Sequence, residues 1–189
     1  MASETTRDHI IQAADRLFYQ QGYEHTSFSD IAAVVNISRG NFYHHFKTKD
    51  EILDAVIESR MAYTEEMLAH WQGEADTPAG RIRRFVHILL TNKDSILQFG
   101  CPVGALCGEL GRLAHPLQGE ANALFTLFRK WLKRQFTEGG RRKDADALAM
   151  HVLAFSQGVA TLASAFHDEK FIRREISMME QWLDRVLED

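Results

Sequence analysis

Apolar side chains recur at helical spacing along most of this chain, and long stretches of helix-forming residues contain few β-branched runs. Only 3 Pro and 12 Gly interrupt the pattern. The chain is therefore expected to be all-α, with about nine helices. The expected helical segments cover approximately residues 6–21, 28–36, 38–46, 48–71, 78–91, 100–113, 117–136, 144–166 and 171–187.

Residues 27–46 are expected to form two short helices joined by a tight turn. Ser27 and Asp30 have the spacing of a capping box, which predicts a helix beginning near Phe28. Asn36 tolerates the left-handed conformation that a sharp turn between helices requires. Ser38 can then cap the second helix.

The second of these helices has a composition suited to binding DNA. From Ser38 to Lys49 the chain contains no acidic residue, and Phe42 and Phe46 are expected to point inward. Arginine can pair with guanine, asparagine with adenine, and tyrosine or lysine with phosphate oxygens. The predicted DNA-binding residues are Thr26, Ser27, Ser38, Arg39, Gly40, Asn41, Tyr43, His44, His45, Lys47 and Lys49.

The segment from Thr26 to Leu53 resembles the TetR family of bacterial transcriptional regulators, on the AcrR- and NemR-like branch. The matching stretches are S-D-I-A, S-R-G-N-F-Y-H-H-F and T-K-D-E-I-L, with Asn36 where the family commonly has glycine. The resemblance implies a three-helix helix-turn-helix head over residues 1–48. It also implies a helical ligand-binding and dimerisation body over residues 49–189.

Composition sets further limits on function. The 189 residues are 45% hydrophobic, enough for a substantial core, and the net charge is −4. An acidic balance weighs against DNA binding, so that prediction depends on the local acid-free stretch. The N-terminus is polar and acidic, unlike a secretory signal, and no apolar run reaches membrane-spanning length. A cytoplasmic protein without a membrane partner is expected.

The last two expected helices are the candidate dimer interface. Their apolar stripes are broad, and Gly158, Ala160, Ala163 and Ser164 are small enough for a second helix to approach closely. Packing within one chain is the alternative interpretation. A homodimer is favoured because one recognition helix reads little DNA and TetR-like proteins pair through these helices. The predicted interface residues are Val152, Phe155, Val159, Leu162, Met179 and Leu183.

Cys101 precedes Pro102, which is suited to the first position of a helix. A thiol at a helix N-cap can have a lowered pKa and react as a nucleophile. The stretch from Gly100 to Leu110 also resembles that of NemR-like repressors, several of which respond to electrophiles or oxidants. A packed core thiol is the alternative. Cys107 lies six residues further on, beyond disulfide reach within one helix.

Aromatic and methionine side chains of the body are expected to form a core that could enclose a ligand pocket. The predicted ligand or sensor residues are Cys101, Glu109, His87, Gln98 and His151. For each of these polar side chains, a structural role with its hydrogen bonds satisfied inside the protein is the alternative. Neither a Cys-x-x-Cys nor a His-x-x-x-His pattern occurs, so no metal or other cofactor is expected.

These observations favour a homodimeric repressor that binds a palindromic DNA operator. A small-molecule inducer, or modification of a body cysteine by an electrophilic effector, would release it. One alternative is a cysteine-dependent enzyme that pairs Cys101 with His87 or His115, but the sequence has no phosphate-binding glycine loop or nucleophile elbow. A non-DNA-binding adaptor on the same helical fold is the other alternative.

Overall fold

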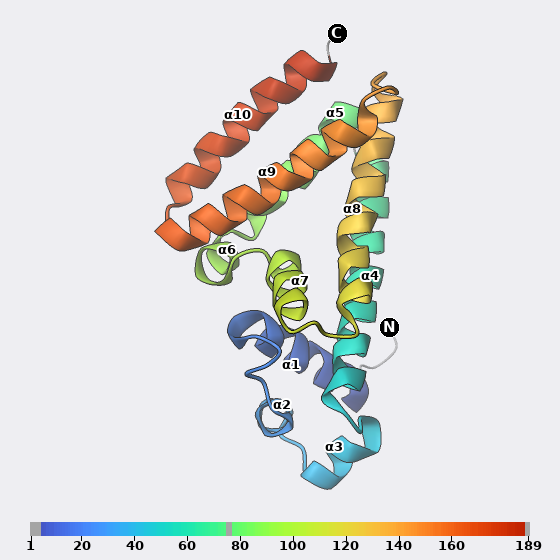
Figure 1. Cartoon of the computed structure of the whole chain (residues 1–189), viewed down its shortest axis with the longest axis vertical. Coiled ribbons are helices and arrows are strands. Elements are labelled where there is room, and N and C mark those ends of the chain that lie inside the picture. The colour runs from blue at the N-terminus through green and yellow to red at the C-terminus, as the bar shows by residue number, and fades with distance from the viewer. Residues whose placement is uncertain (1–4, 75–76, 188–189) are drawn as a thin grey trace. The chain divides into compact units, whose positions relative to one another are not determined.

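The computed structural model describes residues 5–74 and 77–187, and the side chain of Arg39 also lies outside what it describes. Within these ranges the chain forms ten helices and no strand (Figure 1). The all-α class predicted from the sequence is confirmed, and the short helix α6 is an addition to the expected elements. The helices are α1 Thr6–Gln21, α2 Phe28–Val35, α3 Arg39–His45, α4 Lys49–Glu74, α5 Pro78–Thr91, α6 Lys93–Phe99, α7 Pro102–Arg112, α8 Gln118–Glu138, α9 Ala145–Phe166 and α10 Glu169–Leu187.

Side-chain caps explain where several helices begin. The hydroxyl of Ser27 accepts the backbone N–H of Asp30, and the Asp30 carboxylate accepts the backbone N–H of Ser27, which confirms the predicted capping box. Thr5 and Asp8 form the same arrangement at α1. Thr77 caps α5, with Pro78 at the first helical position. Each cap pairs amide groups that the first helical turn leaves without a partner.

The chain divides into two compact units. The first contains residues 1–63 and 105–123, and the second contains residues 64–104 and 124–189. The division at residue 48 predicted from the sequence does not coincide with these units. The reason is that the first part of α4, from Lys49 to Tyr63, and most of α7 cluster with the N-terminal helices.

The first unit has a small core built from the inward faces of α1, α2, α3 and the start of α4. α1 packs against α2, and α2 packs against α3. The side chains that fill this core are aliphatic or aromatic and almost fully buried. They include Ile10, Ala14, Phe18, Ile31, Phe42, Phe46, Ile52, Leu53 and Val56.

The second unit has the larger core, to which α5, α6, α8, α9 and α10 contribute. α10 packs against both α5 and α9. By length and composition α9 could span a membrane, since its mean hydropathy over an 18-residue window is 1.3. The expectation that no apolar stretch reaches spanning length is therefore corrected. Core helices of soluble proteins meet the same criterion, and eight residues of α9 are buried in the structure.

Candidate functional site

The helix-turn-helix predicted from the sequence is formed by α2, a short turn and α3. Asn36 adopts the left-handed conformation, with φ of 56°, and its backbone N–H donates to carbonyls in the last turn of α2. Ile37 donates to the Ala32 carbonyl at 3.3 Å. The Ser38 hydroxyl then accepts the backbone N–H of Asn41 at 3.3 Å and caps α3. Hydrogen bonds therefore join the turn to the end of α2 and to the start of α3.

The inner face of α3 is fixed by aromatic packing. Phe42 and Phe46 are almost fully buried, as predicted. The rings of Phe28 and Phe42 meet edge to face with centroids 5.2 Å apart, which joins α2 to α3. The guanidinium of Arg7 lies 5.0 Å from the centre of the Phe46 ring. These contacts determine which side of α3 remains outside.

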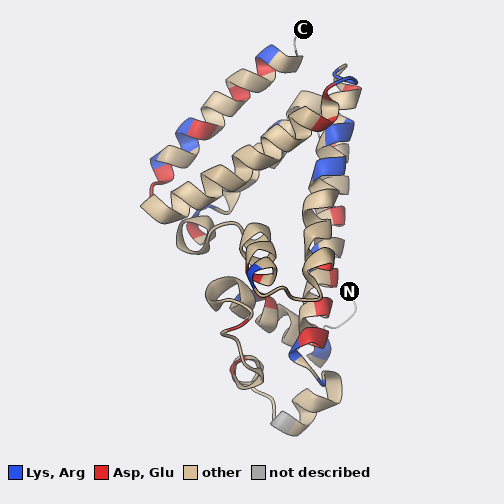
Figure 2. Cartoon of the chain, in the orientation of Figure 1, with Lys and Arg blue, Asp and Glu red and all other residues tan. Residues whose placement is uncertain are grey.

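The outer face of α3 is polar and exposed. Gly40, Asn41 and His44 are exposed, Tyr43 retains 45% of its accessible surface, and His45 is half-buried. In Figure 2 the described part of α3 carries no acidic and no Lys or Arg colouring. The side chains of Asn41, Tyr43 and His44 can form hydrogen bonds with base edges or phosphates of DNA.

The two lysines that follow α3 already have partners within the first unit. Lys47 Nζ donates to the Tyr43 carbonyl, and its backbone N–H donates to Glu51 at 2.8 Å. Lys49 Nζ donates to the carbonyls of Tyr23 at 2.9 Å and Glu24 at 3.3 Å. It also lies 4.2 Å from the centre of the Tyr23 ring. Lys49 therefore has a structural role that the sequence did not reveal.

Thr26 and Ser27 differ in their access to a ligand. Thr26 is only 1% exposed, and its hydroxyl donates to the Gly22 carbonyl at 2.7 Å. The prediction that its side chain binds DNA is therefore corrected. Ser27 is exposed, and its hydroxyl and backbone N–H both bond the Asp30 carboxylate. These bonds stabilise the charged form and lower the pKa of Asp30.

Cys101 lies immediately before α7, which begins at Pro102 as predicted. Its half-buried Sγ accepts the Gly104 backbone N–H and the Gln157 Nε2, each at 3.5 Å. The Cys107 thiol is buried and donates to the Ala121 carbonyl at 3.4 Å. Both cysteines are free thiols, and only Cys101 retains appreciable exposure.

The remaining predicted ligand residues do not line a common cavity. His87 and His151 are exposed, the first hydrogen-bonded to Glu180 at 2.8 Å and the second stacked 4.7 Å from the Trp182 ring centre. Gln98 is exposed as well. The sequence allowed these three positions to face the inside of the body, whereas the structure exposes all three side chains. The helical spacing showed which residues share a face, but not which face the chain covers.

Glu109 belongs to the first unit, whereas the residues with which it was grouped belong to the second. Its carboxylate accepts the backbone N–H groups of Tyr23 and Glu24, each at 2.9 Å. Within the described residues, no group of three His, Cys, Asp or Glu side chains could hold a metal ion.

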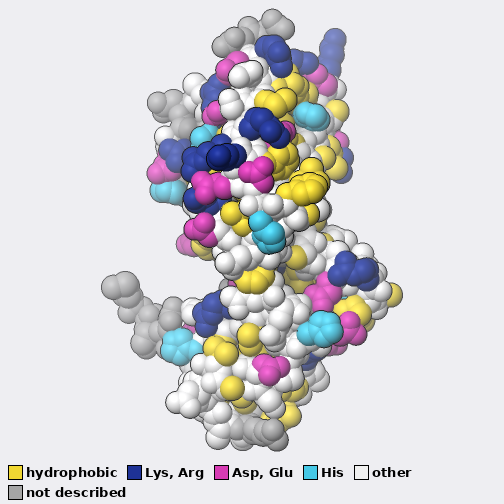
Figure 3. Space-filling view, turned by 90° about the vertical axis from the view of Figure 1, so that its left-hand side faces the viewer, with side chains coloured by type: hydrophobic (Ala, Val, Ile, Leu, Met, Phe, Trp, Pro, Cys, Tyr) yellow, Lys and Arg dark blue, Asp and Glu magenta, His cyan; other side chains and the backbone are white. Residues whose placement is uncertain are grey.

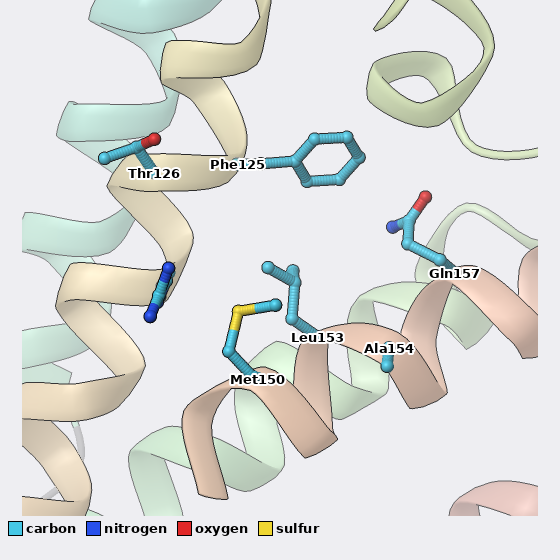
Figure 4. A pocket seen from close by; sticks show the side chains of 7 residues that line it. Phe125, Thr126, Met150, Leu153, Ala154 and Gln157 are labelled. Atoms are coloured by element: carbon cyan, nitrogen blue, oxygen red, sulfur yellow. The ribbon is translucent and has the colours of Figure 1, made fainter. Parts of the chain in front are cut away.

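The second unit does contain a pocket, between α8 and α9, with a volume of about 320 Å³. In Figure 4, Phe125 projects from α8 while Met150, Leu153 and Gln157 project from α9 toward the same space. Arg129 also lines the pocket and forms an ion pair with Asp146. The full lining is Phe125, Thr126, Arg129, Met150, Leu153, Ala154 and Gln157.

The sequence predicted a ligand pocket in the body but not its place between α8 and α9, although a signal for that place was present. The lining residues recur on α8 and on α9 at intervals of three and four, the spacing that places side chains on one helix face. The apolar lining residues can bury the apolar surface of a ligand, and the Gln157 amide can form hydrogen bonds with its polar groups. Gln157 also bonds Cys101, so the pocket wall and the thiol are in direct contact.

Comparison with known proteins agrees with this architecture. The model of the N-terminal domain of bacterial regulatory proteins of the tetR family matches residues 10–56. The model described as transcriptional regulator LmrA/YxaF-like, C-terminal domain, matches residues 78–176, which is more than half of the chain. The chain belongs to the TetR family.

Individual TetR-family members are distant in sequence but similar in fold. The transcriptional repressor DhaR of Mycobacterium sp. (strain GP1) is 24% identical over 133 residues, covering 70% of this chain and 65% of DhaR. A TetR regulator of Legionella pneumophila has a TM-score of 0.82 at 24% identity, covering 96% and 98% of the two chains. The reduced form of E. coli NemR has a TM-score of 0.78 at 18% identity, covering 92% and 95%. This TetR-family chain is a DNA-binding transcriptional regulator with a body of the LmrA/YxaF type.

The predicted dimer interface of this TetR-family chain requires correction. Val152, Val159, Met179 and Leu183 are buried inside the second unit, so they cannot face another chain. Phe155 is half-buried. Of the six predicted residues only Leu162 is exposed, at 44%.

Other apolar side chains of α9 and α10 lie on the surface. Phe166, one turn beyond Leu162 on α9, is 73% exposed, and Met178 on α10 is 56% exposed. Hydrophobic side chains appear among charged ones on the upper part of the surface in Figure 3. α9 and α10 pack against each other, and large exposed apolar residues on neighbouring helices are candidates for a surface that binds another protein.

Proposed function

We propose that this chain acts as a homodimeric repressor whose two copies of α3 bind a palindromic operator. The single observation that carries the proposal is the outer face of α3, exposed and free of acidic groups while its aromatic face is buried. Asn41, Tyr43 and His44 would contact bases and phosphates. Arg39, whose side chain lies outside the described residues, would do so from the start of the same helix.

A dimer is required because α3 has only seven residues and reads few base pairs. In two-fold helix-turn-helix dimers the two recognition helices enter major grooves separated by about one DNA turn, roughly 34 Å. We assign the contact between copies to the exposed apolar residues Leu162 and Phe166 of α9 and Met178 of α10. A regulator of this kind acts where the DNA is, in the cytoplasm.

The α8–α9 pocket is the proposed effector site. Its volume suits a small molecule, its walls are largely apolar, and Gln157 can donate to or accept from a polar group of the ligand. A ligand that bonds Gln157 competes with the hydrogen bond from Gln157 to Cys101. Cys101 lies directly before α7, so ligand binding and the loss of the Gln157–Cys101 hydrogen bond would alter the start of that helix.

Modification of Cys101 is a second route to the same response. An adduct on Sγ removes the acceptor used by Gly104 and Gln157. The half-buried position leaves part of the thiol accessible. An enzyme based on Cys101 has less support, because His87 is bonded to Glu180 and Cys101 to Gly104 and Gln157.

Operator binding is tested with the intergenic DNA beside the gene for this chain. Fluorescence anisotropy should show tight binding to that DNA and weak binding to a scrambled duplex. Asn41→Ala should weaken specific binding by about 1 to 3 kcal/mol per lost base contact, whereas Gln98→Ala, an exposed amide in the second unit, should not. Equal binding of both duplexes by the wild-type chain would refute the proposal.

The effector site is tested with an amphiphilic fluorescent probe, 1-anilinonaphthalene-8-sulfonate. Ala154→Trp places a large ring in the pocket, and Ala147→Trp places the same ring on an exposed part of α9 outside the pocket. The probe should fluoresce with the wild-type chain and with Ala147→Trp and should lose its signal with Ala154→Trp. Undiminished fluorescence with Ala154→Trp would locate probe binding elsewhere.

A further inference from the structure

The first unit contains a cluster of polar side chains that bond to one another and to the backbone of the turn between α1 and α2. The sequence did not predict that these residues contact one another. We call it the turn cluster, and it consists of Tyr23, Lys49, Asp50, Glu109 and His115.

Glu109 makes the most specific contacts of the turn cluster. Oε2 accepts the backbone N–H of Tyr23 and Oε1 accepts that of Glu24, both at 2.9 Å. A carboxylate that accepts two amide protons forms stronger hydrogen bonds than a neutral acceptor. Each oxygen has its own donor, so both atoms of the carboxylate are used.

The local backbone is shaped to admit this carboxylate. Gly22 ends α1 with φ of 92°, a conformation that L side chains rarely adopt. A Cβ at this position would lie 2.9 Å from Glu109 Oε1, closer than real Cβ contacts. Glycine therefore provides both the backbone conformation and the space beside Glu109.

The carbonyl groups of Tyr23 and Glu24 are also hydrogen-bonded within the turn cluster. Lys49 Nζ donates to the carbonyls of Tyr23 and Glu24, whose N–H groups Glu109 accepts. The Tyr23 hydroxyl donates to Asp50 in the first turn of α4, and His115 Nε2 lies 3.3 Å from that hydroxyl. Burial and the bond to Asp50 raise the pKa of Tyr23 above its usual value, so the hydroxyl remains a donor.

We propose that Glu109 is a positioning residue for operator binding. It fixes the α1–α2 turn against α7 and, through Tyr23, against the start of α4. α2 begins only four residues after Glu24, and α3 packs on α2, so the turn sets where the recognition helix lies. The inference rests on the proposed function, because it concerns how the head is held for DNA.

The test compares Glu109→Gln with Glu120→Gln in the full-length dimer. Glutamine keeps the shape of glutamate, but its NH₂ group cannot accept an amide proton, so one of the two bonds is lost. Glu120 is exposed at the start of α8, and its variant makes the same change in charge. We expect Glu109→Gln to weaken operator affinity by about tenfold, the equivalent of one charge-assisted hydrogen bond. Glu120→Gln should bind as the wild type does.

Amide exchange and salt dependence show how Glu109 acts. The amide protons of Tyr23 and Glu24 should exchange faster in Glu109→Gln and at the wild-type rate in Glu120→Gln. The slope of log affinity against log salt should be unchanged, because no phosphate contact is removed. A slope reduced by about 0.9 would instead make Glu109 a mediator of phosphate binding and overturn the positioning role.

A distance measurement separates positioning from stability. Spin labels at Val34→Cys, an exposed site on α2, are placed in a Cys101→Ser, Cys107→Ala background. Glu109→Gln should broaden or shift the distance between the two labels of the folded dimer, whereas Glu120→Gln should not. An unchanged distance, or unchanged operator affinity, would overturn the inference. If the wild-type chain fails to bind the operator, the proposed function fails instead.

Discussion

Lys49 provides a quantitative test because sequence and structure assign it different roles. The sequence places it among phosphate-contacting residues, whereas the structure shows Nζ bonded to the carbonyls of Tyr23 and Glu24 and close to the Tyr23 ring. Lys49→Met keeps the aliphatic stem and removes the charge. Losing charged hydrogen bonds at a half-buried site and a cation–π contact should lower the free energy of unfolding by about 2 kcal/mol.

Two measurements decide between these roles for Lys49. Urea unfolding followed by circular dichroism measures the loss of stability. Anisotropy titrations with operator DNA at several salt concentrations measure the slope of log affinity against log salt. We expect Lys49→Met to be less stable with an unchanged slope. Lys130→Met, an exposed lysine of α8, should leave stability unchanged within about 0.5 kcal/mol.

The opposite result would refute the structural role. A phosphate contact removed from B-DNA binding lowers the salt slope by about 0.9. If Lys49→Met lowers the slope by that amount and unfolds at the wild-type urea concentration, Lys49 binds phosphate in the complex. The contacts with Tyr23 and Glu24 would then contribute little to the stability of the head.

Two further predictions concern the body. Leu162→Glu should convert the dimer to a folded monomer, whereas Leu183→Glu should unfold the chain because Leu183 is fully buried. Sedimentation velocity measures the oligomeric state and circular dichroism measures the folding. A dimer that survives Leu162→Glu would place the interface elsewhere. N-ethylmaleimide should label Cys101 faster than Cys107, since only Cys101 is appreciably exposed. Mass spectrometry that finds Cys107 labelled first would remove the thiol route to release.

Local signals explain what could be predicted from the sequence. The caps at Ser27 and Ser38 and the left-handed Asn36 depend on residues within four positions of each other, and the structure contains all three. The burial of Phe42 and Phe46 followed from helical spacing within a short segment. Such features do not depend on how distant helices meet.

Long-range packing explains what could not be predicted. Val159 and Leu162 differ by only about 60° around α9, yet the first is buried and the second is exposed. Periodicity does not show which edge of a broad apolar stripe is covered by the same chain. The pairing of Glu109 with Tyr23 spans 86 residues of sequence, and no local pattern indicates it.

The central claim is that two copies of α3 bind successive major grooves of one operator, and half-site spacing tests it most directly. Affinity is measured for the operator and for a duplex with five base pairs inserted at its centre of symmetry. Five base pairs rotate one half-site by about half a turn of DNA. We predict binding as a dimer to the operator and a loss of specific affinity on insertion. Equal affinity for both duplexes would contradict the account.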